Sequence, residues 1–189
     1  MHRFQQLLLA AALVLFAVSV NCAGTVLAGK IAVPLYLDSL LTFAASALGG
    51  LWAGIATAIL TNLTMYFFDY TMLPFVLCHL LTAVFANSTF RYYRKKYENR
   101  PLNADIFLWA GLWSAVSNGI LGNLISDALF SSIANPKVDI IVQAIFIGTG
   151  SLSFATHFFG IITNLVDKMI SAALSFFVYR IVRFVQRRL

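Results

Sequence analysis

Residues 37–68 read LDSLLTFAASALGGLWAGIATAILTNLTMYFF, an apolar stretch interrupted by the pair Gly49-Gly50. One helix over this stretch would be about 48 Å long, whereas the hydrocarbon core of a bilayer is about 30 Å thick. Two helices would be about 24 Å each, which suffices for a span that is packed in a bundle or crosses a thinned bilayer. A turn at the glycines also puts Arg3 and Arg91 on the same side of the membrane. The sequence therefore predicts a helical hairpin at Gly49-Gly50.

The composition of the whole chain is that of a membrane protein. Of its 189 residues, 60% are hydrophobic and only 11% are charged, and the mean hydropathy is +0.85. A soluble domain carries about 25% charged residues, so this chain has too few polar side chains to cover a surface exposed to water. The length allows about six spans of roughly 20 residues. We expect an all-α protein in which residues 1–189 form a single six-helix transmembrane domain in a lipid bilayer.

The remaining spans are predicted at residues 4–26, 73–92, 105–130 and 160–185. The N-terminal apolar run is followed by Asn21-Cys22-Ala23-Gly24, a pattern that is typical of a signal peptide. Apolar residues continue beyond it to about Leu27, however, which favours a retained helix. Residues 138–159 are apolar only up to Ile147 and are then interrupted by Gly148-Thr149-Gly150-Ser151. We expect this part to be a re-entrant or interfacial segment on the outer side. Both termini then lie in the cytoplasm.

The positive charges argue against a nucleic-acid partner, although the net charge is +6. They fall in two clusters, at residues 91–100 and 180–188, and each cluster follows a long apolar run. This arrangement is typical of the cytoplasmic ends of membrane helices. The two cysteines, Cys22 and Cys78, lie in apolar surroundings without metal-ligand spacing. We therefore expect no nucleic acid, no metal and no cofactor.

Polar and small residues share one face of the helix predicted at 105–130. They fall within about 140° of one another on a helical projection, with Asp127 at the edge; they are Gly111, Ala115, Asn118, Gly119, Gly122, Asn123 and Ser126. The last helix carries Asn164, Asp167 and Lys168 on a similar face. Asp167 and Lys168 point about 100° apart and need not pair. Because an unpartnered polar group in hydrocarbon is costly, these faces indicate a cavity or a packed helix contact.

We expect these side chains to form a ligand pocket that opens to the outside of the cell. The candidate substrate-binding residues are Tyr36, Asp38, His79, Asn118, Asn123, Asp127, His157, Asn164 and Lys168. Purely structural roles remain open for several of them. Asn118 and Asn123 could bond neighbouring helices. His79 could be a buried structural imidazole, Asp38 a helix cap and Asp127 a solvated residue at a helix end.

Two stretches carry a resemblance to a known family. Residues 34–43 read PLYLDSLLTF and are followed by ALGGLWAG at 47–54, and residues 164–180 read NLVDKMISAALSFFVYR. With the six predicted helices, this pattern resembles the substrate-binding (S) component of energy-coupling-factor (ECF) transporters over nearly the whole chain. The family's Ala-x-x-x-Ala docking pattern in the first helix is not matched, since Val14 and Phe16 stand four residues after Ala10 and Ala12.

The resemblance implies a multi-pass protein of the bacterial cell membrane that binds a vitamin or similar micronutrient from outside. Its partners would be a transmembrane coupling subunit and two ATPase subunits. No Walker-type glycine-rich loop is present, so ATP hydrolysis would come from those partners and we expect no enzymatic activity or catalytic residues in this chain.

Two other functions stay open. One is a stand-alone permease or sensory subunit of the same fold. The other is an intramembrane serine hydrolase using Ser151 and His157, which is disfavoured because no glycine follows the serine. The ligand is not specified by the sequence. Acidic residues predicted on the outer side (Asp38, Asp69, Asp127 and Asp139) disfavour a polyanion, while Lys168 could neutralise one carboxylate or phosphate.

Overall fold

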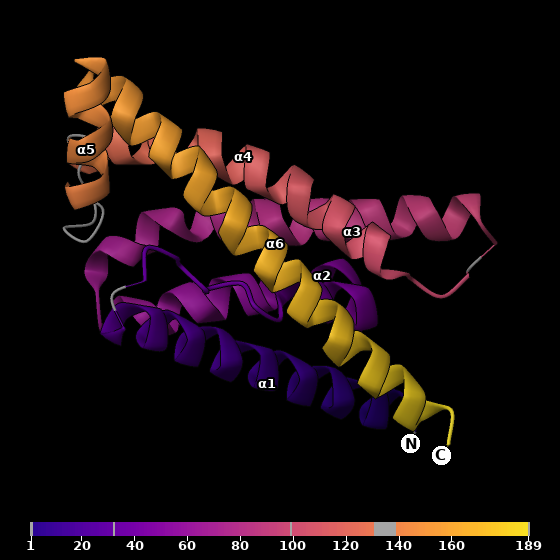
Figure 1. Cartoon of the computed structure of the whole chain (residues 1–189). Helices are drawn as coiled ribbons and strands as arrows, with labels where there is room; N and C mark the ends of the chain where they lie inside the picture. The colour runs from indigo at the N-terminus through magenta and orange to yellow at the C-terminus, as the bar shows by residue number, and fades with distance from the viewer. Residues whose placement is uncertain (1, 32, 99, 131–138, 189) are drawn as a thin grey trace.

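The computed structural model describes residues 2–31, 33–98, 100–130 and 139–188. Within these ranges every regular element is a helix (Figure 1): α1 (His2–Lys30), α2 (Thr42–Tyr66), the 3-10 helix η1 (Tyr70–Phe75), α3 (Val76–Lys96), α4 (Ala104–Phe130), α5 (Asp139–Thr149) and α6 (Leu152–Gln186). Five segments are long and apolar enough to cross a membrane, namely those in α1, α2, η1 with α3, α4 and α6. The all-helical class and the presence of several candidate membrane spans are confirmed, with five such helices against the six spans predicted.

The difference in number comes from α2, which reverses direction at Gly50. Gly50 has φ 76° and ψ −167°, a backbone conformation that is essentially restricted to glycine. A Cβ atom on Gly54 would collide with Ser46 Oγ, although residues eight apart in a straight helix are separated by about 12 Å. The expected break at Gly49-Gly50 is therefore present. The arm before it, residues 42–49, is only about 12 Å long, because residues 33–41 are not helical.

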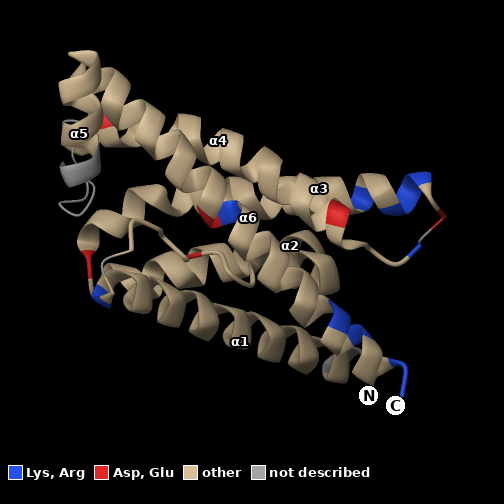
Figure 2. Cartoon of the chain, in the orientation of Figure 1, with Lys and Arg blue, Asp and Glu red and all other residues tan. Residues whose placement is uncertain are grey.

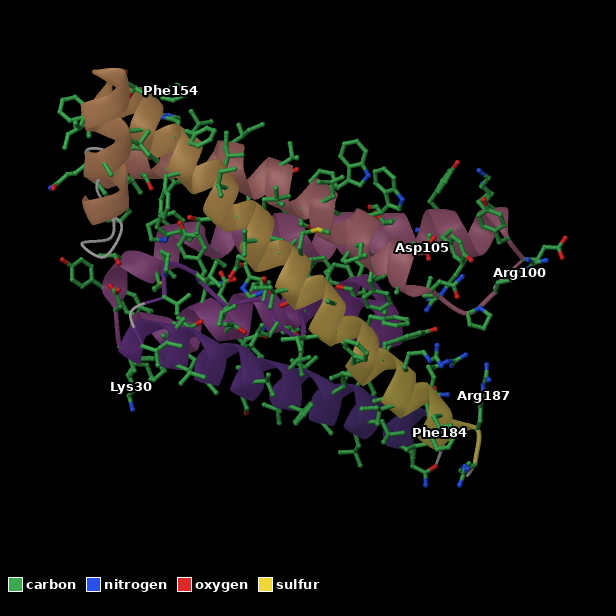
Figure 3. The ribbon with its side chains drawn as sticks, in the orientation of Figure 1. Lys30, Arg100, Asp105, Phe154, Phe184 and Arg187 are labelled. Carbon is green, nitrogen blue, oxygen red and sulfur yellow. The ribbon has the colours of Figure 1, made fainter. Side chains whose placement is uncertain are left out.

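The two ends of the helical bundle differ in charge. Both termini and the α3–α4 connection lie at one end, which we call the terminal end, and α5 lies at the opposite end (Figure 1). Lysines and arginines gather at the terminal end (Figure 2). Figure 3 labels Arg100 and Arg187 there, with Lys30 and Phe154 at the opposite end. The basic clusters of the sequence thus lie together in space.

Aromatic side chains fill the core of the terminal half. Phe107 of α4 packs against Phe90 of α3 and Tyr179 of α6, with ring centroids 4.6 and 5.4 Å apart, and all three are buried. Near Gly111, α4 and α6 come close together, since a Cβ atom there would lie 2.9 Å from the Cβ of Ala172. The terminal half is therefore a tightly packed region.

Several predicted boundaries were wrong. The last helix begins at Leu152 rather than near residue 160, because Ser151 Oγ accepts a hydrogen bond from the backbone N–H of Phe154 and caps the helix there. The segment predicted as one re-entrant or interfacial piece at 138–159 is divided between α5 and the first turns of α6, and its position relative to a membrane stays a prediction; Val138 itself lies outside the described residues. Val142 of α5 packs against Ala155 and Phe159 of α6. The first helix ends at Lys30, four residues beyond the span predicted at 4–26.

Candidate functional site

The site is built around the non-helical segment 33–41, whose backbone lies among the helices. A backbone in such a place needs hydrogen-bond partners, because hydrocarbon supplies none. The N–H groups of Tyr36 and Leu37 donate to Asp167 Oδ1 of α6 over 3.1 and 2.7 Å. The N–H of Leu41 donates to Asn21 Oδ1 of α1 over 2.9 Å. Side chains of α1 and α6 therefore hold this segment in place.

A buried ion cluster joins the same segment to α6. Lys168 Nζ lies 2.8 Å from each of three oxygen atoms, Asp38 Oδ1, Ser39 Oγ and Asp167 Oδ2. Lys168 is 2% exposed, and Asp167 is fully buried. Asp167 and Lys168 thus do pair, contrary to the expectation from helical spacing that they need not. The long lysine side chain spans the angular offset between neighbouring positions.

A cavity of about 320 Å³ lies beside the ion cluster. Five of the nine predicted site residues line it, namely Tyr36, Asp38, Asn118, Asn164 and Lys168. The lining continues to Asp69 and Thr71, next to the α2–η1 connection at the end opposite the termini (Figure 1). The cavity thus runs from the middle of the bundle toward the opposite end.

Asn118 presents an unpaired acceptor. Its Nδ2 donates to Thr82 Oγ1 over 2.8 Å, and Thr82 Oγ1 in turn donates to the carbonyl of Cys78. Because the threonine proton is used, the amide nitrogen must face Thr82. Asn118 Oδ1 is then left without a hydrogen-bond partner among the described residues, although the side chain is 1% exposed. An unpaired buried acceptor costs about 1–3 kcal/mol, which a donor in the cavity would offset.

His79 does not line the cavity. Its Nε2 lies 2.6 Å from Thr42 Oγ1, and its Nδ1 lies 2.9 Å from Asn62 Nδ2. The imidazole is completely buried behind Asn62, which does line the cavity. The structure therefore gives His79 the role of a support for the wall, through Asn62 and Thr42.

Asn123, Asp127 and His157 form a separate group nearer the opposite end. His157 Nε2 lies 3.0 Å from Asp127 Oδ2, and Asn123 Nδ2 donates to the His157 carbonyl over 3.0 Å. None of the three lines the cavity. His157 Nδ1 contacts the carbonyl of Ser153, so both ring nitrogens have partners other than Ser151. The group ties α4 to the first turns of α6.

Sequence reasoning missed two residues that the structure brings to the site. Asn21 had drawn attention only as part of an apparent signal peptide, and Asn62 was not among the candidates. Asn21 and Asn62 are buried at 0% and 4% exposure and are single amides within apolar helices. A solitary amide in an apolar span is a signal for an interior-facing position and could have found both.

Among the described residues, no group of three or more His, Cys, Asp or Glu side chains could hold a metal ion. Comparison of the chain with protein-family models, with curated proteins and with solved structures found no match.

Proposed function

We propose that this protein is the solute-binding subunit of an ATP-driven importer of the ECF type, and that it captures a small water-soluble micronutrient such as a vitamin or precursor. The observation that supports this most is the cavity inside the helical bundle. Its volume of about 320 Å³ is in the range of small-molecule pockets, roughly 300–1,000 Å³. It combines apolar walls with a few polar groups, which is the usual composition of a specific ligand site.

The proposed topology follows from charge. In a bacterial cell membrane the end rich in lysine and arginine faces the cytoplasm, so the terminal end would be inside. The α2–η1 connection and the adjoining part of the cavity would then face outward. On this proposal residues 33–49 count as one pass, made of an extended part and a short helical arm, which brings the number of passes to six.

The proposed mechanism assigns different tasks to chain and partners. The solute enters from the outer end and binds between segment 33–41 and the faces of α4 and α6 that carry Asn118 and Asn164. The energy for delivery comes from a transmembrane coupling subunit with two ATPase subunits, because this chain has no phosphate-binding loop of its own.

Binding is the decisive test. The detergent-solubilised protein would be screened by thermal unfolding against water-soluble vitamins and their precursors, and molecules released from the purified protein would be identified by mass spectrometry. We expect one compound class to raise the unfolding temperature. Asn118→Ala should weaken this response, whereas Asn123→Ala, outside the cavity, should leave it intact. Absence of any bound or stabilising compound would contradict the proposal.

A second measurement separates an ECF subunit from a stand-alone permease or sensory protein. The chain would be co-expressed with a coupling subunit and its two ATPases and purified through a tag on one ATPase. We expect the chain to co-purify with them. Uptake of the bound compound by cells that lack every such module would instead favour the stand-alone permease.

A further inference from the structure

The charges around the cavity do not balance. The buried cluster contains two carboxylates, Asp38 and Asp167, and one ammonium group, Lys168. Asp167 accepts two backbone N–H bonds and one bond from Lys168. Counted with both acids ionised, the cluster has a formal charge of −1. A third acid, Asp69, lines the cavity toward the opposite end.

Lys168 cannot offset this excess for an anionic ligand. An ammonium group has three N–H donors, and the three oxygens at 2.8 Å use all of them. Lys168 is also the only cation among the described residues that line the cavity. A ligand carboxylate or phosphate would therefore find no free cationic donor and would meet a net negative charge. Lys168 therefore does not neutralise a ligand carboxylate or phosphate, a role that the sequence had left open.

The remaining walls suit a cation that carries a hydrogen-bond donor. Asn118 Oδ1 is an acceptor without a hydrogen-bond partner in the described part of the chain. Tyr36 and Phe75 line the cavity together with Met65 and Met72. Aromatic faces attract cations, and thioethers adapt to flat or irregular ligands. Asp38, whose side chain is 21% exposed and lines the cavity, supplies the negative charge.

We propose that the ligand is a small organic cation with at least one N–H or O–H donor, held by the negative charge of the Asp38 cluster and by Asn118 Oδ1. This inference rests on the proposed function, since it assigns a ligand class to the same cavity. The donor completes the hydrogen bonding of Asn118, and the positive charge neutralises the excess carboxylate.

The test uses three probes of nearly identical shape: benzamidinium, benzamide and benzoate. Thermal unfolding of the purified chain in detergent would be followed as each probe is titrated. We expect benzamidinium to bind at least about tenfold more tightly than benzamide, and benzoate to have no effect. Asp38→Asn should abolish the preference for benzamidinium. Asn118→Ala should weaken binding of benzamidinium and benzamide alike, because the shared amino donor loses its acceptor.

Two further variants distinguish a loss of binding from a loss of folding. Asp69→Asn, near the end of the cavity, should reduce the preference without touching the buried cluster. Asp105→Asn, an exposed acid in the first turn of α4 at the terminal end (Figure 3), should change nothing. An equal response to all three probes, including no response at all, would overturn the inference. Release of an anionic or neutral micronutrient from the purified protein would also overturn it, while leaving the proposed capture function standing.

Discussion

The two halves of the bundle are built from the same helices but are packed in opposite ways. In the terminal half, α4 and α6 meet through Phe107 and Tyr179, and the core is closed. In the other half, the same two helices carry Asn118, Asn164 and Lys168 around a cavity. The terminal half is therefore held together by close side-chain packing. The half that contains the cavity is held together by ion pairs and hydrogen bonds.

The largest loss of stability is expected from a substitution in the half that contains the cavity. Lys168→Met should destabilise the folded protein by about 3–5 kcal/mol, because it leaves the buried Asp167 and the partly buried Asp38 without their cation. Thermal unfolding in detergent would measure the loss. Lys30→Met, at an exposed position, is the matched control and should be nearly neutral. Unchanged stability of the Lys168 variant would mean that charge does not hold this half together.

The second substitution tests the terminal half. Phe107→Ala removes the ring that contacts both Phe90 and Tyr179. Because lipid is as apolar as the core, mainly packing is lost, and we expect about 2–3 kcal/mol rather than the roughly 3–5 kcal/mol of a soluble core. Ligand affinity measured on the folded fraction should stay unchanged. A large loss of affinity would show that the two halves are not independent.

The third substitution concerns the bend between the two arms of α2. Gly50→Ala should cost about 1–3 kcal/mol through backbone strain alone, since no atom lies within 4 Å of the added Cβ. Gly148→Ala is the control, because its Cβ would also meet open space and its φ is not positive. That variant should be neutral or slightly stabilised in the same unfolding assay. Equal behaviour of the two variants would argue against strain at Gly50.

The smallest effect is expected at the group near the opposite end. Asp127→Asn weakens the contact with His157, where both side chains are more than a third exposed. Exposed ion pairs contribute about 0–1 kcal/mol, so the unfolding temperature should change little, and ligand affinity not at all. A fall in affinity would indicate that the ligand site extends beyond the cavity.

The sequence predicted the parts of the fold that depend on local pattern. The Gly49-Gly50 pair indicated the reversal, and the apolar runs and basic clusters indicated the membrane helices. It could not predict which polar residues would meet. Asp38 and Lys168 are 130 positions apart, and their contact depends on how segment 33–41 enters the bundle. Asn118 and Asn123 share a helical face, yet they are five positions and therefore about 7.5 Å apart along the helix axis, and only Asn118 lines the cavity.

The bonds from side chains to the main chain of segment 33–41 have a consequence for natural variation. Asn21 and Asp167 bind backbone groups of this segment, and Ser175 binds those of Leu40 and Ala44. Backbone groups are the same whatever solute a homologue carries. On the proposed function, these three positions should therefore stay constant among relatives that bind different compounds, while Asn118 and Asn164 change with the compound. A survey of homologues would then show its most invariant columns at the scaffold rather than at the ligand.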